Sequence, residues 1–385
     1  MNRKLATLIG AQFLSAFADN AVLFTVIAMT MQQLGRGNWY IPALQGSFIL
    51  AFILLTPWVG ALADQHPKPL ILLGANLVKA LGAFLIAEGI EPLAGYAIIG
   101  IGAACYGPAK YGIIPEMTRP ELLVRANGWV EGATIAAILL GTVAGARLAD
   151  DSISSALRVI IALYLASGCS TLLLPKTTQP RTLTVENTIL ELSKTLRLLV
   201  LKKRNLLIIL ALSLFWSTAA TLRVVLVAWA PAVLETETAS QIADLTFFMA
   251  LGIVVGAALV PRLIPLERLR RARFAAYPLS LMLALLAFTV DANFAKLILF
   301  GIGICGGIIV VPLNAAIQAV GHETIGSGRA VAAQNFYQNS AILLGMGIYA
   351  LAASLELEPR DAMLILSIIA LASALIIGRN LPSRP

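Results

Sequence analysis

Charged residues are scarce in this sequence of 385 residues, and their scarcity excludes most soluble folds. Only 12% of the residues are Asp, Glu, Lys or Arg, whereas a soluble domain averages about 25%. Hydrophobic residues make up 59% of the chain, and its mean hydropathy is +0.86. The composition therefore predicts a polytopic membrane protein.

The sequence also lacks the residue patterns of most enzymes. The two histidines, His66 and His322, fall in predicted cytoplasmic loops, so neither can complete a Ser-His-Asp set inside a membrane cavity. No acyltransferase-type His-x-x-x-x-Asp motif and no glycine-rich ATP-binding loop occurs. Cys105, Cys169 and Cys305 have no CxxC spacing, which favours a packing role over disulfides or metal ligation. We expect no enzyme activity, no cofactor and no metal.

Apolar runs long enough to cross a bilayer recur along the whole chain. A spanning helix needs about 20 apolar residues, and twelve runs approach that length. These runs cover 6–31, 41–63, 69–89, 93–114, 126–149, 156–174, 206–232, 241–262, 274–290, 295–318, 330–353 and 361–378. The predicted fold class is all-α, with 12 transmembrane helices.

The net charge of +8 is distributed unevenly over the predicted loops. Lys and Arg gather on the side of the N-terminus, and acidic residues gather on the other side. Since cytoplasmic loops are rich in Lys and Arg, both termini are predicted to be cytoplasmic. The charge therefore indicates orientation rather than a nucleic-acid partner. Its densest run, RLRRARF at 268–274, is interpreted as an anchor near anionic lipid head groups, with a specific lipid or protein site as the alternative.

The longest polar connection, at 175–205, separates six predicted spans from six more. Within it, residues 186–201 have the pattern of an amphipathic helix on the cytoplasmic face. The sequence thus predicts an N-terminal half over 1–174 and a C-terminal half over 206–385.

Short matches between the halves indicate an internal repeat. AILLG occurs at 137–141 and again at 341–345, and VGALAD at 59–64 corresponds to VGAALV at 255–260. The matches follow the same order in both halves, which favours a parallel repeat. Two repeated halves with a substrate site between them are typical of secondary transporters.

The loop after the second predicted span, GALADQHPK, has a recognisable spacing of Gly60, Asp64 and Lys68. It resembles the signature loop of the major facilitator superfamily, Gly-x-x-x-Asp-x-x-x-Arg/Lys. Gly60 is expected to allow a close helix contact, and Asp64 to meet a helix end or a basic side chain. This resemblance implies a conformational gating loop, with an ordinary polar hairpin as the alternative.

Five ionisable residues fall at membrane depth in the predicted spans. They are Asp19, Lys79, Lys110, Glu131 and Arg223. Such residues usually face an interior cavity and pair with one another. We expect Asp19 to pair with Lys110 or Arg223. A structural ion pair is the alternative role for Lys79 and Glu131, and snorkelling to the interface is the alternative for Lys110.

Uncharged polar residues accompany these charges in the first half. Asn20 follows Asp19 directly, Tyr106 lies one turn before Lys110, and Asn127 lies one turn before Glu131. They are candidates for hydrogen bonds to a polar head group, and interhelical hydrogen bonds are the alternative.

Four stretches are similar to one family. AQFLSAFADNAVLF (11–24), GAACYGPAKYGIIPEM (102–117), ANGWVEGATIAAILLGTVAG (126–145) and TLRVVLVAWAP (221–231) resemble the lysophospholipid transporters (LplT) of the major facilitator superfamily. The resemblance covers nearly the whole chain. Ala18 stands where the family typically has Gly, a change between two small residues.

The resemblance implies that the chain moves lysophospholipids, chiefly lysophosphatidylethanolamine and also lysophosphatidylglycerol. They would cross the inner membrane of a Gram-negative bacterium from the outer to the cytoplasmic leaflet. Some relatives carry a fused acyltransferase and acyl-carrier-protein synthetase. This chain is expected to be a stand-alone form and a monomer that works beside a separate acyltransferase. The implied transport residues are Asp19, Lys110 and Arg223, supported by Asn20 and Glu131.

Two other functions are compatible with the residues. A proton-coupled exporter of drugs or other amphiphiles would use Asp19 or Glu131 as its proton carrier. A non-transporting membrane scaffold for the acyltransferase would leave the buried charges unexplained.

Overall fold

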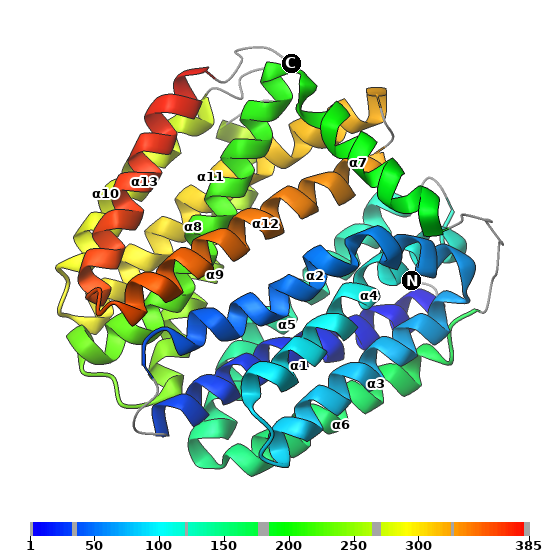
Figure 1. Cartoon of the computed structure of the whole chain (residues 1–385), viewed down its shortest axis with the longest axis horizontal. Coiled ribbons are helices and arrows are strands. Elements are labelled where there is room, and N and C mark those ends of the chain that lie inside the picture. Colours follow the sequence, from blue (N-terminus) through cyan, green and yellow to red (C-terminus); the bar gives the residue numbers. More distant parts are fainter. Residues whose placement is uncertain are drawn as a thin grey trace. The chain divides into compact units, whose positions relative to one another are not determined.

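The computed structural model describes residues 3–32, 37–119, 122–175, 185–263, 271–324 and 327–380. Within these ranges the chain forms thirteen helices and no strand (Figure 1). They are α1 (Arg3–Gln32), α2 (Tyr40–Gln65), α3 (Lys68–Ala87), α4 (Pro92–Met117), α5 (Leu123–Asp151), α6 (Ile153–Thr171), α7 (Val185–Leu201), α8 (Lys203–Leu234), α9 (Ala239–Leu263), α10 (Arg273–Ala287), α11 (Ala292–Thr324), α12 (Ser327–Ser354) and α13 (Pro359–Asn380).

The predicted all-helical membrane fold is confirmed. Ten of the described helices are long and apolar enough to cross a membrane, namely all except α7, α10 and α12. Helices nevertheless form at each of the twelve predicted spans. Two of the helices at predicted spans, α10 and α12, are not long and apolar enough. Helix α10 has only 15 residues, and α12 carries the polar run AAQNFYQNSA. The remaining helix, α7, covers the segment of the linker that was predicted to be amphipathic.

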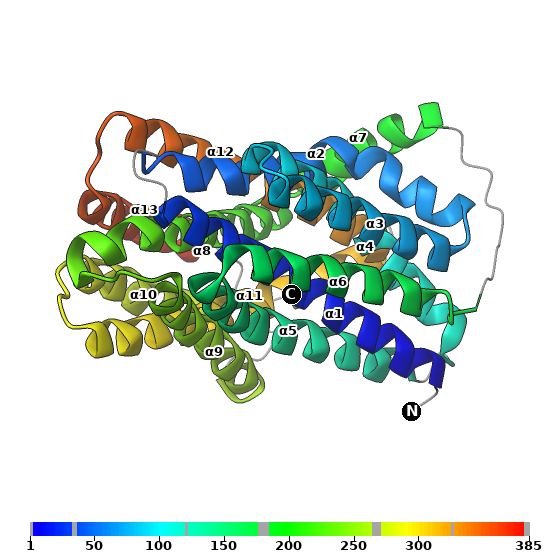
Figure 2. The ribbon, with the colours of Figure 1, turned by 90° about the horizontal axis from the view of Figure 1, so that it is seen from below.

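The helices pack into two compact units. The first comprises Met1–Leu34, Ser47–Glu191 and Thr238–Ser240, and the second comprises Gly35–Gly46, Leu192–Glu237 and Gln241–Pro385. In the first unit, α1 packs on α5 and α6, and α3 packs on α4 and α6. In the second, α8 packs on α12 and α13, and α10 packs on α11 and α13 (Figures 1 and 2). The same order of pairing recurs in both units, as a parallel repeat requires.

The repeated AILLG motif ends at a close helix contact in both units. A Cβ on Gly141 of α5 would lie 2.4 Å from the carbonyl oxygen of Phe17 on α1. A Cβ on Gly345 of α12 would lie 2.3 Å from Oγ of Ser217 on α8. Only glycine lets the helices approach so closely, which is a common feature of packed transmembrane helices.

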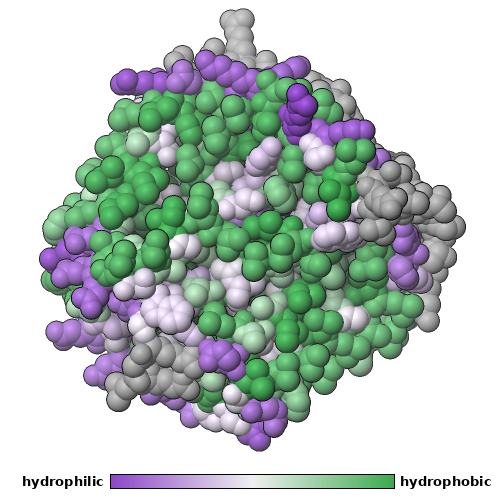
Figure 3. Space-filling model, viewed as in Figure 1, coloured by the Kyte–Doolittle hydropathy of each residue, from purple (hydrophilic) through white to green (hydrophobic). Residues whose placement is uncertain are grey.

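The described surface is largely apolar. Hydrophobic residues cover most of the face shown in Figure 3, and hydrophilic residues gather along its edges. Large apolar side chains such as Leu54, Leu140 and Leu297 are exposed on the helices. Exposed apolar surface on this scale is expected of helices that face lipid rather than water.

Candidate functional site

The carboxylate in the middle of α1 pairs with a lysine of α3. Lys79 Nζ lies 2.8 Å from Asp19 Oδ2, and both residues belong to the first unit. The Lys79 side chain is 1% exposed and the Asp19 side chain 23%. The structure therefore pairs Asp19 with Lys79 and places Lys110 beside Glu131, so the predicted Asp19–Lys110 pair is wrong. The alternative pairing of Asp19 with Arg223 stays a prediction. The sequence shows how far along its predicted span each charged residue lies. It does not show toward which neighbouring helix the side chain points.

Both oxygens of the Asp19 carboxylate are engaged. Tyr164 on α6 donates a hydrogen bond of 2.9 Å to Oδ1, while Lys79 occupies Oδ2. The ammonium of Lys79 also donates to Ser15 Oγ at 3.0 Å and lies 4.8 Å from the centre of the Tyr106 ring. Charge-assisted hydrogen bonds and a nearby aromatic face both stabilise a cation away from water.

A chain of neutral hydrogen bonds continues from this ion pair into the helix bundle. Ser15 donates to Asn76 Oδ1 at 2.9 Å, and Asn76 donates to Ser167 Oγ at 3.2 Å. Ser167 in turn donates to the carbonyl oxygen of Ala11 at 2.7 Å. Ser15, Asn76 and Ser167 are all buried. A buried polar network with its bonds made fixes the positions of α1, α3 and α6 relative to one another.

A second, looser ion pair lies between α4 and α5. Lys110 Nζ is 3.9 Å from Glu131 Oε1, and Tyr111 donates a hydrogen bond of 2.6 Å to the same oxygen. The ammonium of Lys110 also lies 4.1 Å from the centre of the Tyr111 ring. Lys110 is buried, whereas the Glu131 side chain is 47% exposed. This carboxylate therefore remains accessible to a ligand.

The remaining predicted site residues lie on α1, α5 and α8. Asn20 donates a hydrogen bond of 2.9 Å to the carbonyl oxygen of Ala16 in its own helix, α1. Asn127 is partly buried on α5. Arg223 is partly buried on α8, which places it in the second unit, whereas both ion pairs belong to the first.

The predicted gating loop is mostly helical. Gly60 lies inside α2, and a Cβ built on it would meet no atom within 4 Å, so the predicted close helix contact at Gly60 is wrong. The side chain of Asp64 lies outside the described residues. Lys68 begins α3 and forms an ion pair with Glu116 of α4. This pair joins the α2–α3 corner to the end of α4.

Three members of the cluster around Asp19 were missed from the sequence. Ser15, Tyr164 and Ser167 belong to residue types that are common in transmembrane helices. Ser15 had a weak signal, because it lies four residues before Asp19 and so on the same helix face. Tyr164 and Ser167 lie about 145 positions or more along the chain from Asp19, where helix periodicity gives no guide.

The hydrogen bond from Tyr164 should contribute measurably to stability. We expect Tyr164→Phe to lower the free energy of unfolding by about 1 kcal/mol, because the Asp19 carboxylate loses a buried donor. Tyr349→Phe is the matched control, since the buried hydroxyl of Tyr349 has no hydrogen-bond partner among the described residues. Thermal unfolding in detergent measures both, and equal melting temperatures would contradict this role.

Comparison of the sequence with known proteins identifies the family to which the chain belongs. The family model of the Major Facilitator Superfamily matches residues 8–346. The chain is 39% identical over 362 residues to a protein named lysophospholipid transporter LplT from Serratia proteamaculans (strain 568), covering 91% of this chain and 89% of that protein. A protein of the same name from Yersinia pestis (strain Pestoides F) is 38% identical over 363 residues, covering 92% and 88%.

Solved transporter structures share the fold at low sequence identity. The crystal structure of the nucleoside transporter NupG matches with a TM-score of 0.73 and 15% identity, covering 98% of each chain. A POT family transporter in complex with 5-aminolevulinic acid matches with a TM-score of 0.76 and 13% identity, covering 98% of this chain and 96% of that one. At such identities the likeness concerns the fold alone.

Proposed function

We propose that this chain, which belongs to the lysophospholipid transporter (LplT) family of the major facilitator superfamily, moves lysophospholipids between the leaflets of a membrane. The observation that carries the proposal is the Asp19–Lys79 pair, with Asp19 partly accessible and Lys79 enclosed. Ionised groups at membrane depth are usually part of a substrate or ion pathway.

A lysophosphatidylethanolamine head group has the chemistry to compete for this pair. Its ammonium can replace Lys79 beside Asp19, and its phosphate can pair with a cation. In the first unit Lys110 is the candidate for the phosphate, because its pairing distance to Glu131 is long, at 3.9 Å. Arg223 in the second unit stays a second predicted ligand for the phosphate. A guanidinium suits phosphate well because it can donate two parallel hydrogen bonds.

Exchange of ion-pair partners would couple binding to movement of the two halves. While Asp19 holds Lys79 and Tyr164, α1 is tied to α3 and α6. A head group that takes Asp19 loosens these ties within the first unit, and we propose that this change lets the two halves rock against each other. Lysophosphatidylglycerol has no ammonium, so we propose that it ranks below lysophosphatidylethanolamine as a substrate.

We place the protein in the bacterial inner membrane, with both termini in the cytoplasm. The gathering of Lys and Arg on one side of the predicted spans supports this orientation. The proposed direction is from the outer to the cytoplasmic leaflet, where a separate acyltransferase would restore the second chain. We propose that the transporter acts as a monomer.

Flux through the purified protein tests the proposal. Sealed liposomes would carry labelled lysophosphatidylethanolamine in one leaflet, and its appearance in the other would be followed with and without a proton gradient. We expect flux that persists without the gradient. Gradient-driven movement of a cationic dye without lysolipid flux would instead indicate the proton-coupled exporter. No flux of either compound would favour the membrane scaffold.

A further inference from the structure

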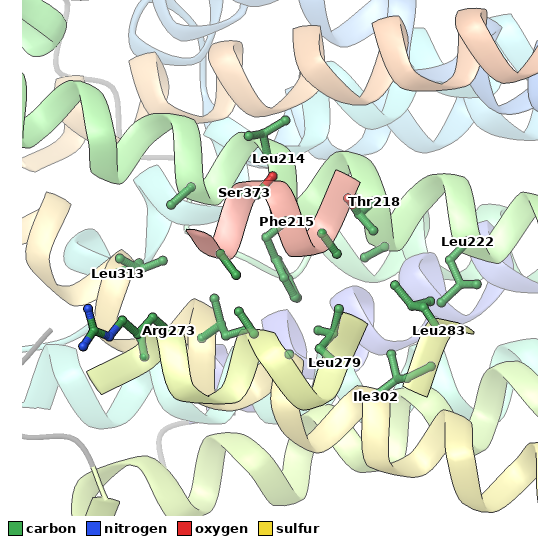
Figure 4. A pocket seen from close by; sticks show the side chains of 18 of the residues that line it. Leu214, Phe215, Thr218, Leu222, Arg273, Leu279, Leu283, Ile302, Leu313 and Ser373 are labelled. Atoms are coloured by element: carbon green, nitrogen blue, oxygen red, sulfur yellow. The ribbon is translucent and has the colours of Figure 1, made fainter. Parts of the chain in front are cut away.

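The second unit contains a cavity that the proposed transport does not use. A cavity of about 100 Å³, part of it open to the surroundings, lies between α8, α9, α10, α11 and α13. Figure 4 shows side chains of α8 and α10 on opposite sides of the cavity, including Phe215 and Leu279. All residues that line the cavity belong to the second unit.

Small residues on the facing helices create this space. Ala276 on α10, Gly303 and Gly306 on α11, and Ala370 on α13 line the cavity without filling it. A Cβ on Gly306 would lie 3.0 Å from Cζ of Phe215, so the aromatic ring already rests against this glycine. The other lining residues are almost all aliphatic. The walls therefore suit a hydrocarbon chain and exclude a polar metabolite.

One end of the cavity is positively charged. Arg273 is the first residue of α10 and lies at one end of the cavity in Figure 4, while Leu222 and Leu283 lie at the other. Its Nε is buried without a hydrogen-bond partner among the described residues. The described ion pairs do not include Arg273, and its Cζ lies 5.0 Å from the centre of the Phe274 ring. The N-terminus of α10 adds its own partial positive charge.

The two remaining polar residues of the lining do not compete for an anion. Ser373 donates its hydroxyl hydrogen to the carbonyl oxygen of Ile369 at 2.7 Å, and Thr218 carries no charge. A ligand that pairs with the charge of Arg273 brings an anionic group, and a ligand that fills the cavity brings an apolar body. A phospholipid with one acyl chain has both.

We propose that this cavity is a second lipid site, which holds the acyl chain of a single-chain anionic phospholipid with its phosphate at Arg273. The site is distinct from the Asp19 cluster and does not rest on the proposed transport. The exposed Arg271, next to the same helix start, adds to the positive field that attracts anionic head groups. A free phosphate ion would leave the apolar cavity unfilled, whereas a single-chain phospholipid fills it and pairs with Arg273.

Photolabelling of the full chain in detergent tests this site. The probe is lysophosphatidylglycerol with a diazirine near the end of its acyl chain, and the labelled residues are located by mass spectrometry. We expect labels on the cavity-lining residues of α8, α10, α11 and α13. A monoacylglycerol with the same chain should compete at least about tenfold more weakly, because it lacks the phosphate. Inorganic phosphate should not compete.

Two pairs of variants separate the charged end from the apolar cavity. Arg273→Gln should lower labelling at least about tenfold, whereas Arg271→Gln, which removes the same charge outside the cavity, should lower it less than about twofold. Ala276→Phe should fill the cavity and abolish labelling, whereas Leu281→Phe on the exposed face of α10 should not. If Ala276→Phe does not fold, Ala370→Phe from α13 makes the same test.

Three results would overturn the second site. They are labels confined to the first unit, unchanged labelling of Arg273→Gln, and equal competition by the monoacylglycerol. Photolabelling measures lipid binding in the second unit. A failure of the proposed transport would instead be seen as an absence of lysophospholipid flux in liposomes.

Discussion

Replacing Asp19 by asparagine should reduce lysophosphatidylethanolamine flux by more than about tenfold. Asparagine has nearly the same shape and can still accept the hydrogen bond from Tyr164, but it removes the charge that is proposed to bind the ammonium. The loss should be smaller for lysophosphatidylglycerol, whose head group has no ammonium. Initial flux rates in liposomes for the two lipids measure both effects.

The same substitution should also destabilise the protein, because it leaves the ammonium of Lys79 buried without its counter-ion. Removing one partner of a buried ion pair costs about 3–5 kcal/mol, and the Lys79 side chain is 1% exposed. Adding Lys79→Met should recover most of this stability without restoring flux. The double variant therefore separates a role in transport from a role in folding.

Glu131→Gln is the comparison for the stability measurement. Its carboxylate is 47% exposed and lies 3.9 Å from Lys110, so its loss should cost at most about 1 kcal/mol. Wild-type lysophosphatidylethanolamine flux in Asp19→Asn, or in the double variant, would contradict the proposed role of Asp19.

These residues show which part of the site could be predicted from the sequence. Charges at membrane depth could be found by position alone, and Asp19, Lys79, Lys110 and Glu131 all lie inside helices. The pairing partners of these charges could not be predicted, because pairing depends on the direction in which each helix presents its side chains. Lys79 was predicted to have a structural ion pair as its alternative role, and that pair turns out to be with Asp19.

The fold shows the same division. The helices could be predicted from the sequence, but the contacts between them could not. Hydropathy predicted every long helix, and the repeated AILLG motif marked Gly141 and Gly345, which both lie at close helix contacts. Gly60 belongs to an equally clear motif, yet a Cβ on it would meet no atom of the described residues within 4 Å. A glycine in a sequence permits a close contact, and only the packing decides whether a second helix uses it.

Gly145 provides the sharpest test of such a contact. A Cβ at this position would lie 2.3 Å from Cα of Ala21 and 2.8 Å from its carbonyl oxygen, so it would collide with the backbone of α1. Gly145→Leu must therefore push α1 away from α5. We expect it to lower the free energy of unfolding by about 3 kcal/mol or more, beyond ordinary overpacking, because backbone atoms cannot rotate aside.

Displacement of α1 should also disturb the polar cluster, since Ala21 is two residues from Asp19 on the same helix. Gly132→Leu is the matched control, because Gly132 lies on the same helix, is exposed and would meet no atom within 4 Å. It makes the same change of residue and gains helix propensity, so it should be neutral or slightly stabilising. Thermal unfolding in detergent compares the two variants. Equal melting temperatures would mean that α1 and α5 can separate at little cost, and that their contact does not hold Asp19 in place.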